Sequence, residues 1–274
     1  MSGDKVICED CVTGYLKTGE TKGDTKTIGT VQAYFTPSSS HKSEKAIVII
    51  GDIFGWEFIN ARLYADEIAR QTGFLVVLPD LMKGYAAPAD ALMKPPVGFV
   101  NSILHKAKMV PMIYSSGRAI MALKPDAVLD LAHGVLNDLR ASYGIKSIGV
   151  HGFCFGGKYS ILLGNKGPND TPSPVQAFAA GHPSLLKIPG DVENIDPTIP
   201  GFLQYAESDF MVSEKNRQDI DHIIQEKSFS NLKTKLYPGT KHGFCLKSND
   251  DDEKERATAT EATTDAAQFF ASKL

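Results

Sequence analysis

Cysteine, basic charge and long apolar runs are all scarce in this sequence. Four cysteines in 274 residues are too few for a disulfide scaffold. Lys and Arg number 29 against 32 Asp and Glu, without the basic excess that a nucleic-acid backbone attracts. No run approaches the roughly 18 apolar residues of a membrane helix, and Met1–Lys5 lacks the pattern of a secretory signal. We therefore expect a protein that stays inside the cell, keeps its cysteines as thiols and binds neither nucleic acid nor membrane.

The composition that remains is that of an ordinary folded protein. Hydrophobic residues make up 42% of the chain and charged residues 22%, which excludes intrinsic disorder. Because α/β folds often place about 250 residues around one core, we expect residues 1–274 to form one domain.

Short apolar runs recur along the chain, separated by segments with helical periodicity. Such runs lose the alternating polar pattern when both faces of a strand are covered, so they predict a largely parallel sheet flanked by helices, an α/β fold. Val31–Phe35 alternates instead, which predicts an antiparallel edge. The proline-containing stretch Leu81–Pro125 is too long for a simple connection and is expected to cover a site. The predicted strands are Ala46–Ile50, Phe74–Leu78, Ser147–His151, Val175–Ala180, Phe202–Ala206 and Lys233–Tyr237, and the predicted helices include Ala61–Thr72, Asp126–Tyr143, Lys158–Asn165 and Glu214–Lys227.

The segment Gly152–Gly157 joins a predicted strand to a predicted helix. Glycines stand two residues before and two after Cys154, as a sharp strand-to-helix turn requires when larger side chains would collide with neighbouring backbone. The turn also places the thiol at a helix N-terminus, which favours the thiolate. This pattern predicts a nucleophile elbow; the alternative is a buried cysteine in a glycine-rich turn.

Two later residues complete the order found in α/β-hydrolases: nucleophile, acid and histidine. Asp209 follows the strand Phe202–Ala206, and His242 follows a later strand and the expected turn Pro238-Gly239. Ligands of parallel sheets gather at such carboxyl ends of strands. The alternatives are a helix-capping role for Asp209, with Glu207 as the acid, and a loop histidine.

These residues resemble the dienelactone hydrolases, cysteine-dependent members of the α/β-hydrolase fold. The resemblance implies Cys154 as nucleophile, His242 as general base and Asp209 as the acid that orients it, with no cofactor. The roles suit the chemistry, because imidazole can accept a thiol proton and later activate water. The N-terminal cysteine pair and the His-Pro-Ser segment look most like the fungal branch. The resemblance runs through Cys8–Cys11, Gly51–Gly55, Pro79–Leu81, Gly152–Gly157, His182–Ser184 and His242–Phe244.

The loop Asp52–Gly55 follows the strand Ala46–Ile50 and is expected to supply half of an oxyanion hole. We assign the backbone N–H groups of Ile53 and Phe155 as its two donors. In the family the position of Asp52 commonly holds a glutamate that interacts with the nucleophile. The aspartate here is one methylene shorter, and the alternative is a loop residue that caps the next helix.

Two positions that bear on substrate depart from the bacterial-type family. Bacterial-type members carry arginines at these positions that bind the substrate carboxylate. This chain has no arginine there, and the corresponding segments are Met82–Tyr85 and Cys245–Lys247. Lysine cannot make the planar two-point contact of a guanidinium. We expect Tyr85, Lys247 and His182 to line the pocket and the substrate to differ from the bacterial one or to be less acidic.

The leading hypothesis is a hydrolase of small esters or lactones, acting through a thioacyl-enzyme as a monomer or homodimer. A non-catalytic hydrolase fold that binds such a molecule is the alternative, but it would not need a triad and both oxyanion loops. A thiol-disulfide enzyme is disfavoured because Cys154 has no resolving cysteine nearby in sequence. Cys8-x-x-Cys11 lacks the second pair expected of a structural zinc site, so we expect no metal.

The last three residues, Ser272-Lys273-Leu274, match a peroxisomal address read by its receptor. A C-terminal helix can also end this way by chance, and Phe269 and Phe270 could hold it against the protein. The competing location is the cytoplasm.

Overall fold

The computed structural model describes residues 9–36, 44–95, 117 and 123–274. Cys8 lies outside the described residues. So does most of the predicted connection Leu81–Pro125, and with it the expectation that this connection covers a site.

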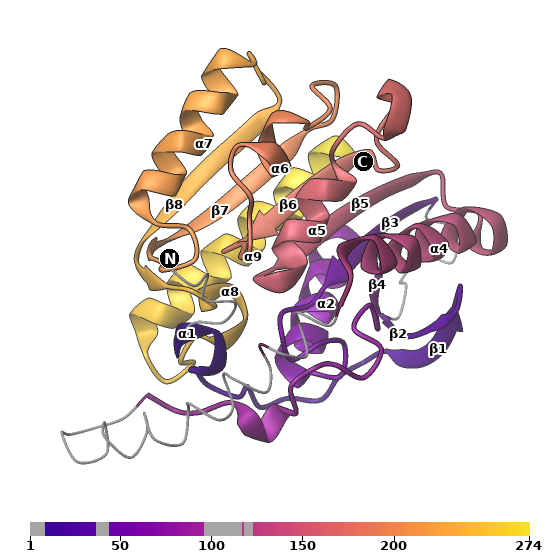
Figure 1. Ribbon diagram of the computed structural model, residues 1–274. Helices are drawn as coiled ribbons and strands as arrows, with labels where there is room; N and C mark the ends of the chain where they lie inside the picture. The colour runs from indigo at the N-terminus through magenta and orange to yellow at the C-terminus, as the bar shows by residue number, and fades with distance from the viewer. Residues whose placement is uncertain (1–8, 37–43, 96–116, 118–122) are drawn as a thin grey trace.

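Within the described residues, eight strands form one sheet at the centre of the fold (Figure 1). From β4 through β3 and on to β8, neighbouring strands pair in parallel, whereas β2 is antiparallel to both β1 and β4. The predicted parallel sheet and antiparallel edge are therefore both confirmed. In spatial order the strands are β1 (Asp24–Ile28), β2 (Val31–Phe35), β4 (Leu75–Pro79), β3 (Lys45–Ile50), β5 (Ser147–Phe153), β6 (Ala177–Gly181), β7 (Gly201–Ser208) and β8 (Leu232–Lys241).

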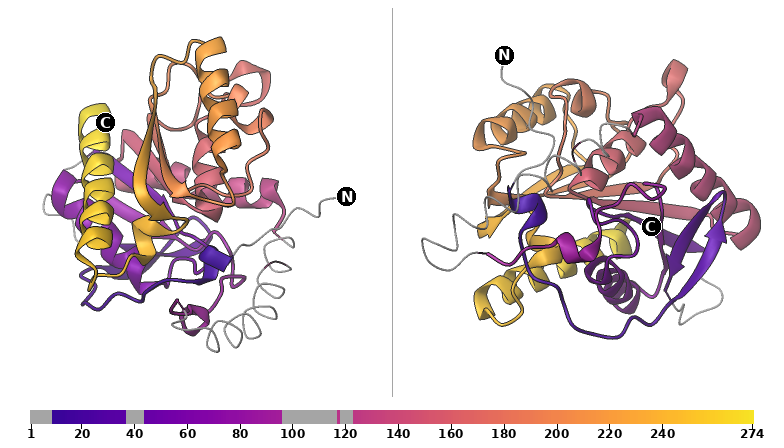
Figure 2. Two further views of the ribbon diagram at one scale, coloured as in Figure 1. Left: turned by 90° about the vertical axis from the view of Figure 1, so that its left-hand side faces the viewer. Right: turned by 60° about the horizontal axis from the view of Figure 1, so that its bottom comes forward.

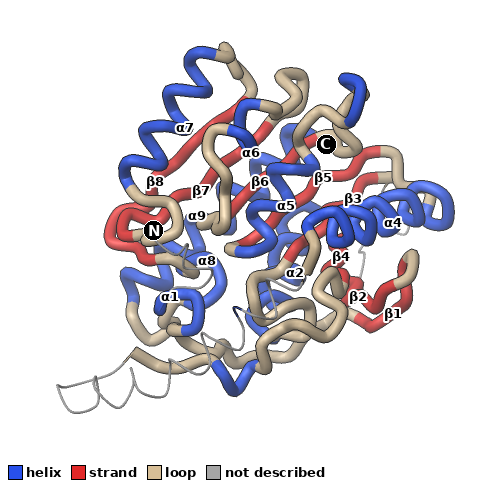
Figure 3. Tube along the Cα trace, in the orientation of Figure 1, coloured by secondary structure: helices blue, strands red, loops and turns tan. Residues whose placement is uncertain are grey.

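Helices cover both faces of this sheet (Figures 2 and 3). Helices α2, α8 and α9 pack together on one face, and α4, α5, α6 and α7 follow one another across the other. The short α1 lies near one end of the sheet (Figure 1). The helices are α1 (Glu9–Val12), α2 (Ile59–Thr72), α4 (Pro125–Tyr143), α5 (Phe155–Leu163), α6 (Gly190–Glu193), α7 (Glu214–Glu226), α8 (Phe244–Lys247) and α9 (Glu253–Lys273), with single 3₁₀ turns at Ala89–Ala91 and Pro168–Asp170.

Helix α4 shows how the sequence pattern produces these layers. Val128, Ala132, Val135 and Leu139 recur at helical spacing, and all four are buried. Gly144 then ends the helix in the left-handed conformation, with its N–H bonded to the carbonyl of Leu139. The predicted helix Asp126–Tyr143 is therefore confirmed, with its start one residue earlier, at Pro125.

Several expected boundaries shift by one to three residues, and the end of β8 shifts by four. The strand does not end before Pro238-Gly239 but continues to Lys241. Residues 238–240 bulge opposite Glu207 of β7, whose carboxylate accepts a hydrogen bond from the Gly239 N–H at 2.9 Å. The bulge absorbs the turn residues inside the strand, so that β8 leads directly to His242.

The C-terminal helix stays wound to its end. The N–H of Leu274 donates to the carbonyl of Phe270 at 3.0 Å, and the Leu274 side chain is partly buried against the core. None of the helices in the described part of the chain is long and apolar enough to cross a membrane.

Candidate active site

The predicted elbow is present at the junction of β5 and α5. Cys154 stands between them with a φ of 50° and a ψ of −114°, outside the regions that ordinary residues prefer. A Cβ on Gly152 would lie 2.0 Å from the carbonyl oxygen of Gly156, and one on Gly156 would lie 2.1 Å from that of Ile50. The glycines are therefore needed to let the backbones meet, and the turn holds the thiol at the start of α5.

The structure brings His242 and Asp209 to the same end of the sheet. Asp209 follows β7, and both of its carboxylate oxygens lie close to Nδ1 of His242, Oδ1 at 3.0 Å and Oδ2 at 2.9 Å. Oδ1 also accepts hydrogen bonds from the backbone N–H groups of Met211 and Val212. Asp209 thus faces His242 rather than capping α7, which is capped by Ser213.

Cys154 lies on the other side of the imidazole. Its Sγ and a ring nitrogen of His242 are within 4.8 Å of one another, and Nε2 of His242 has no hydrogen-bond partner among the described residues. Cys154 is 1% exposed and His242 3% exposed. With Nδ1 committed to Asp209, Nε2 is the nitrogen left to exchange a proton with the thiol.

The electrostatics of this pair favour charge separation. A hydrogen bond with Cys11 and the charge of His242 hold the pKa of Cys154 well below its ordinary value, although burial raises it. Burial lowers the pKa of His242, but the Cys154 thiolate and the Asp209 carboxylate raise it more. Both shifts favour a thiolate on Cys154 beside an imidazolium on His242.

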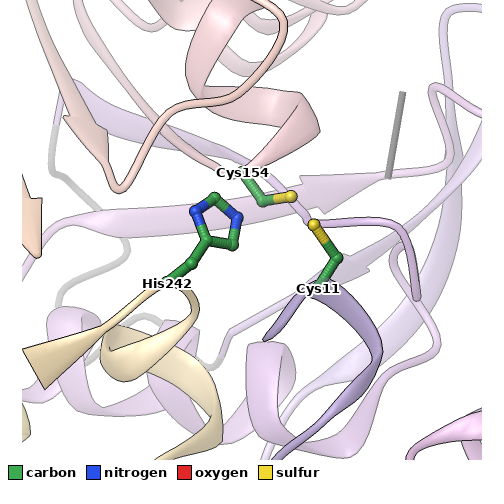
Figure 4. Close-up of side chains that lie close together, drawn as sticks. All are labelled: Cys11, Cys154 and His242. Atoms are coloured by element: carbon green, nitrogen blue, oxygen red, sulfur yellow. The ribbon is translucent and has the colours of Figure 1, made fainter. Parts of the chain in front are cut away.

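Cys11 is a neighbour of Cys154 that sequence reasoning missed. It lies in α1, and its Sγ is within 4.8 Å of both Cys154 Sγ and His242 (Figure 4). In sequence it is far from Cys154, and its only signal was its place in the N-terminal cysteine pair. Three groups that could ligate a metal meet here, although no metal was expected from Cys8 and Cys11.

Asp52 is completely buried, close enough to Cys154 for the charge of the thiolate to raise its pKa. Its Oδ1 accepts a hydrogen bond from the N–H of Phe54 at 3.0 Å, whereas Oδ2 has no hydrogen-bond partner among the described residues. Burial raises the pKa of Asp52 to about 6, against the lowering effect of Lys247. Asp52 does not cap α2, whose N-cap is Phe58. It is a carboxyl group whose charge changes near neutral pH.

The three predicted substrate residues lie in different surroundings. Lys247 is 4% exposed; its Nζ donates to the carbonyls of Asp10 and Cys11 and lies 3.9 Å from Oδ2 of Asp52. Tyr85 is half-exposed on the turn after β4. Lys247 therefore contacts both Cys11 and Asp52.

His182 stands against the imidazole of His242, with ring centroids 4.9 Å apart in an edge-on arrangement. Burial lowers the pKa of His182, so it is neutral. Ser184, two residues on, places its Oγ 3.6 Å from Cys154 Sγ. That contact was not expected from sequence, although both residues belong to the His-Pro-Ser segment.

The two backbone donors predicted for an oxyanion hole lie on neighbouring parts of the fold. Phe155 follows the nucleophile, and Ile53 lies on the loop after β3, the strand next to β5. Within the described part of the chain, neither N–H has a hydrogen-bond acceptor. The Ile53 carbonyl accepts from the N–H of Ala87, which fixes the loop.

A hollow of about 380 Å³ adjoins this cluster. Its lining includes Asp10 of α1, Lys247 of α8 and His242, but Cys154 is not among the described residues that line it. Helix α1 therefore borders this hollow.

Comparison with known proteins agrees with the geometry. The model of the dienelactone hydrolase family matches residues 31–274. Hydrolase tropI of Talaromyces stipitatus is 25% identical over 260 residues, which cover 95% of this chain and 94% of that protein. The carboxymethylenebutenolidase homolog of Mus musculus is 28% identical over 222 residues, 81% of this chain and 78% of its own. The solved dienelactone hydrolase of Anabaena variabilis has the same fold, with a TM-score of 0.55, 12% identity and coverage of 93% and 98%. The chain has the α/β-hydrolase fold and belongs to the dienelactone hydrolase family.

Proposed function

We propose that this protein hydrolyses small carboxylic esters or lactones through a thioacyl-enzyme on Cys154. The observation that carries the proposal is the arrangement of the elbow thiol, which faces an imidazole whose other nitrogen is bonded to a buried carboxylate. A cysteine that only filled space would need neither the strained backbone nor the paired histidine.

In the first half of the reaction, the Cys154 thiolate attacks the acyl carbon. The oxygen becomes an oxyanion that accepts hydrogen bonds from the N–H groups of Ile53 and Phe155. As the tetrahedral intermediate collapses, the bond to the leaving oxygen breaks, and the His242 imidazolium gives that oxygen its proton. With a lactone, the released hydroxyl stays attached to the acyl group.

In the second half, neutral His242 takes a proton from water, and the resulting hydroxide attacks the thioester. The C–S bond breaks and the carboxylic acid leaves, which restores the thiolate beside an imidazolium. Asp209 holds the imidazole in the tautomer with hydrogen on Nδ1 and stabilises its charged form in both halves. The cycle requires no cofactor.

The surroundings of Lys247 favour a substrate that carries no free carboxylate. Its ammonium group already serves two carbonyls and Asp52, and no arginine stands at either position that grips the carboxylate in bacterial-type members. We therefore propose neutral esters and lactones as better substrates than those carrying a free carboxylate.

The test is a panel of p-nitrophenyl esters, thioesters and unsaturated lactones, assayed on the wild type, Cys154→Ala and Cys245→Ala. Cys245 is the matched control, because it is also a buried cysteine and burial raises its pKa. We expect Cys154→Ala to lose hydrolysis and Cys245→Ala to keep it, and iodoacetamide to label Cys154. Full activity in Cys154→Ala would reject the nucleophile, and a single burst of product without turnover would support a protein that only binds.

Location is a separate proposal, based on Ser272-Lys273-Leu274. Import would require the wound last turn of α9 to open, because Leu274 is partly buried. A fluorescent protein fused at the N-terminus should give a punctate signal that becomes diffuse when Leu274 is deleted. A diffuse signal with the intact tail would favour the cytoplasm.

A further inference from the structure

Two thiols meet at the proposed catalytic centre, although 142 residues separate them in the chain. Cys11 Sγ and Cys154 Sγ lie within 4.8 Å of one another, and Figure 4 shows the two sulfurs pointing toward each other. Each residue is 1% exposed. The triad chemistry uses Cys154 but has no step for Cys11.

Several contacts hold Cys11 in this place. Lys247 donates from its ammonium group to the carbonyls of Asp10 and Cys11. The next residues are tied to the body by backbone hydrogen bonds, from Met93 N–H to the Val12 carbonyl at 2.9 Å and from Gly14 N–H to the Met93 carbonyl at 3.0 Å. Lys247 and the backbone of Met93 therefore hold α1 in place, and with it the thiol of Cys11 beside Cys154.

We propose that Cys11 is the resolving thiol of Cys154, and that the pair forms a reversible disulfide when a hydroperoxide oxidises the nucleophile. Sulfur–sulfur bonding needs the two atoms to approach to about 2 Å. The approach requires a short movement of the four-residue α1 rather than a rearrangement of the sheet. The pKa of Cys154 supports the proposal, because thiolates are the form that peroxides oxidise.

The chemistry balances in two steps. In the first, the Cys154 thiolate attacks one oxygen of hydrogen peroxide, the O–O bond breaks, and the leaving hydroxide takes a proton from His242 to become water. Cys154 is then a sulfenic acid. In the second, Cys11 sulfur attacks Cys154 sulfur, the S–O bond breaks, and the hydroxide leaves as water with the Cys11 proton. Two thiols and one peroxide give one disulfide and two waters.

The consequence is protection of the nucleophile. Without a neighbouring thiol, a sulfenic acid can be oxidised further to sulfinic acid, which dithiols do not reduce. With Cys11 in place, the disulfide forms first, and an external dithiol restores both thiols by exchange. The enzyme would lose hydrolysis under peroxide and regain it on reduction.

The experiment treats the full-length wild type, Cys11→Ser, Cys8→Ser and Cys245→Ser with hydrogen peroxide and then with dithiothreitol. Activity is expressed relative to each untreated variant, and the linkage is mapped by mass spectrometry of non-reduced peptides. For the wild type we expect a peptide joining Cys11 to Cys154, a loss of two hydrogen masses and recovery of most activity. Cys8→Ser and Cys245→Ser should behave in the same way, whereas Cys11→Ser should gain two oxygens on Cys154 and recover little.

Absence of the Cys11–Cys154 peptide, or recovery in Cys11→Ser equal to that of the wild type, would overturn the proposal. A linkage of Cys154 to Cys8 or Cys245 would also overturn it. The activity readout rests on the proposed function, but the peptide map does not. If Cys154 were not the nucleophile, the linkage would form without loss of hydrolysis, which separates the failure of one proposal from that of the other.

Discussion

The two sides of His242 are built differently. On the strand-end side, formed by Asp209 and the ends of β7 and β8, the carboxylate accepts hydrogen bonds from the imidazole and from two backbone N–H groups. On the α1 side, formed by Cys11, Asp52 and Lys247, the buried carboxylate has one backbone donor and an ammonium group 3.9 Å away. Both carboxylate oxygens of Asp209 therefore have hydrogen-bond partners, whereas Oδ2 of Asp52 has none among the described residues.

This difference separates two tasks. A carboxylate that accepts several hydrogen bonds is held in one position, as orientation of an imidazole requires. A buried carboxyl group with an incomplete set changes its charge readily, so it can adjust the electrostatics of a neighbouring thiol. We therefore expect changes on the strand-end side to damage hydrolysis more than changes on the α1 side.

The largest effect is expected from Gly156→Ala, in the elbow that holds Cys154 between the two sides. The new Cβ would lie 2.1 Å from the carbonyl oxygen of Ile50 and 2.6 Å from that of Gly51, and backbone of a central strand cannot move aside. We expect little folded protein. Gly134→Ala is the control, since its Cβ would meet nothing within 4 Å inside α4. It should stabilise the fold by about 0.5–1 kcal/mol.

Circular dichroism during heating of both variants provides the measurement. Wild-type stability in Gly156→Ala would show that the close approach of α5 to β3 is wrong.

The second effect is loss of proton transfer with a normal fold. We expect His242→Ala to lower kcat/KM by a factor of about 100 to 10,000. Asp209→Asn should lose less, because a histidine keeps some basicity without its partner. Glu207→Gln is the matched control, because the Glu207 carboxylate accepts a hydrogen bond from the Gly239 N–H in the bulge of β8, and the effect of its replacement should stay within about twofold.

Steady-state kinetics on one p-nitrophenyl ester compares the three variants. A severe effect of Glu207→Gln beside a silent Asp209→Asn would transfer the orienting role to Glu207.

The strand-end side could be predicted from sequence because local patterns encode it. The glycines around Cys154 predict the elbow. Parallel strands bring their carboxyl ends to one edge of the sheet, so the chain order was enough to place Asp209 and His242 together. Even the bulge in β8, which was not predicted, left His242 at the same end of the sheet.

The α1 side could not be predicted in the same way. No periodicity says where a four-residue helix at the start of the chain will dock, and the contact of Cys11 with Cys154 depends on hydrogen bonds from Lys247 and Met93. Lys247 was expected at a pocket wall because of its place after His242. Its burial under α1 depends on tertiary packing, which the spacing of residues in the sequence does not predict.

The third effect tests whether Lys247 anchors α1 or binds substrate. Lys247→Met removes the donor to the Asp10 and Cys11 carbonyls, so we expect a loss of stability of about 1–3 kcal/mol. If it anchors α1, hydrolysis of neutral and acidic esters should fall together, by about tenfold, the equivalent of about 1.4 kcal/mol. Amide hydrogen exchange at residues 9–15 should become faster.

The control is Lys233→Met, an exposed lysine of β8, which should change neither exchange nor kinetics. A loss confined to acidic esters, with unchanged exchange in α1, would instead make Lys247 a substrate-binding residue.

The smallest effect on hydrolysis is expected at Asp52, where pH provides the sharper measurement. Burial raises the pKa of this carboxyl to about 6 in the folded protein, from 3.8 in the unfolded chain. The folded state therefore binds the proton more tightly, so stability from this group is fully present below pH 3.8 and is lost as pH rises to about 6. Asp52→Asn should not show this loss.

The difference in unfolding free energy between wild type and Asp52→Asn, measured from pH 4 to 7, isolates this group because the other titrating residues are common to both. Rates of Cys154 alkylation over the same range report on the thiol. The charge of Cys154 raises the pKa of Asp52, so the thiolate and the carboxylate repel each other, and we expect alkylation above about pH 6 to be slower in the wild type than in Asp52→Asn. Asp52→Glu should remain active with a displaced pH–rate profile. If neither variant altered the profile, Asp52 would be a loop residue without influence on Cys154, and the charge-adjusting role of the α1 side would have to come from Lys247 alone.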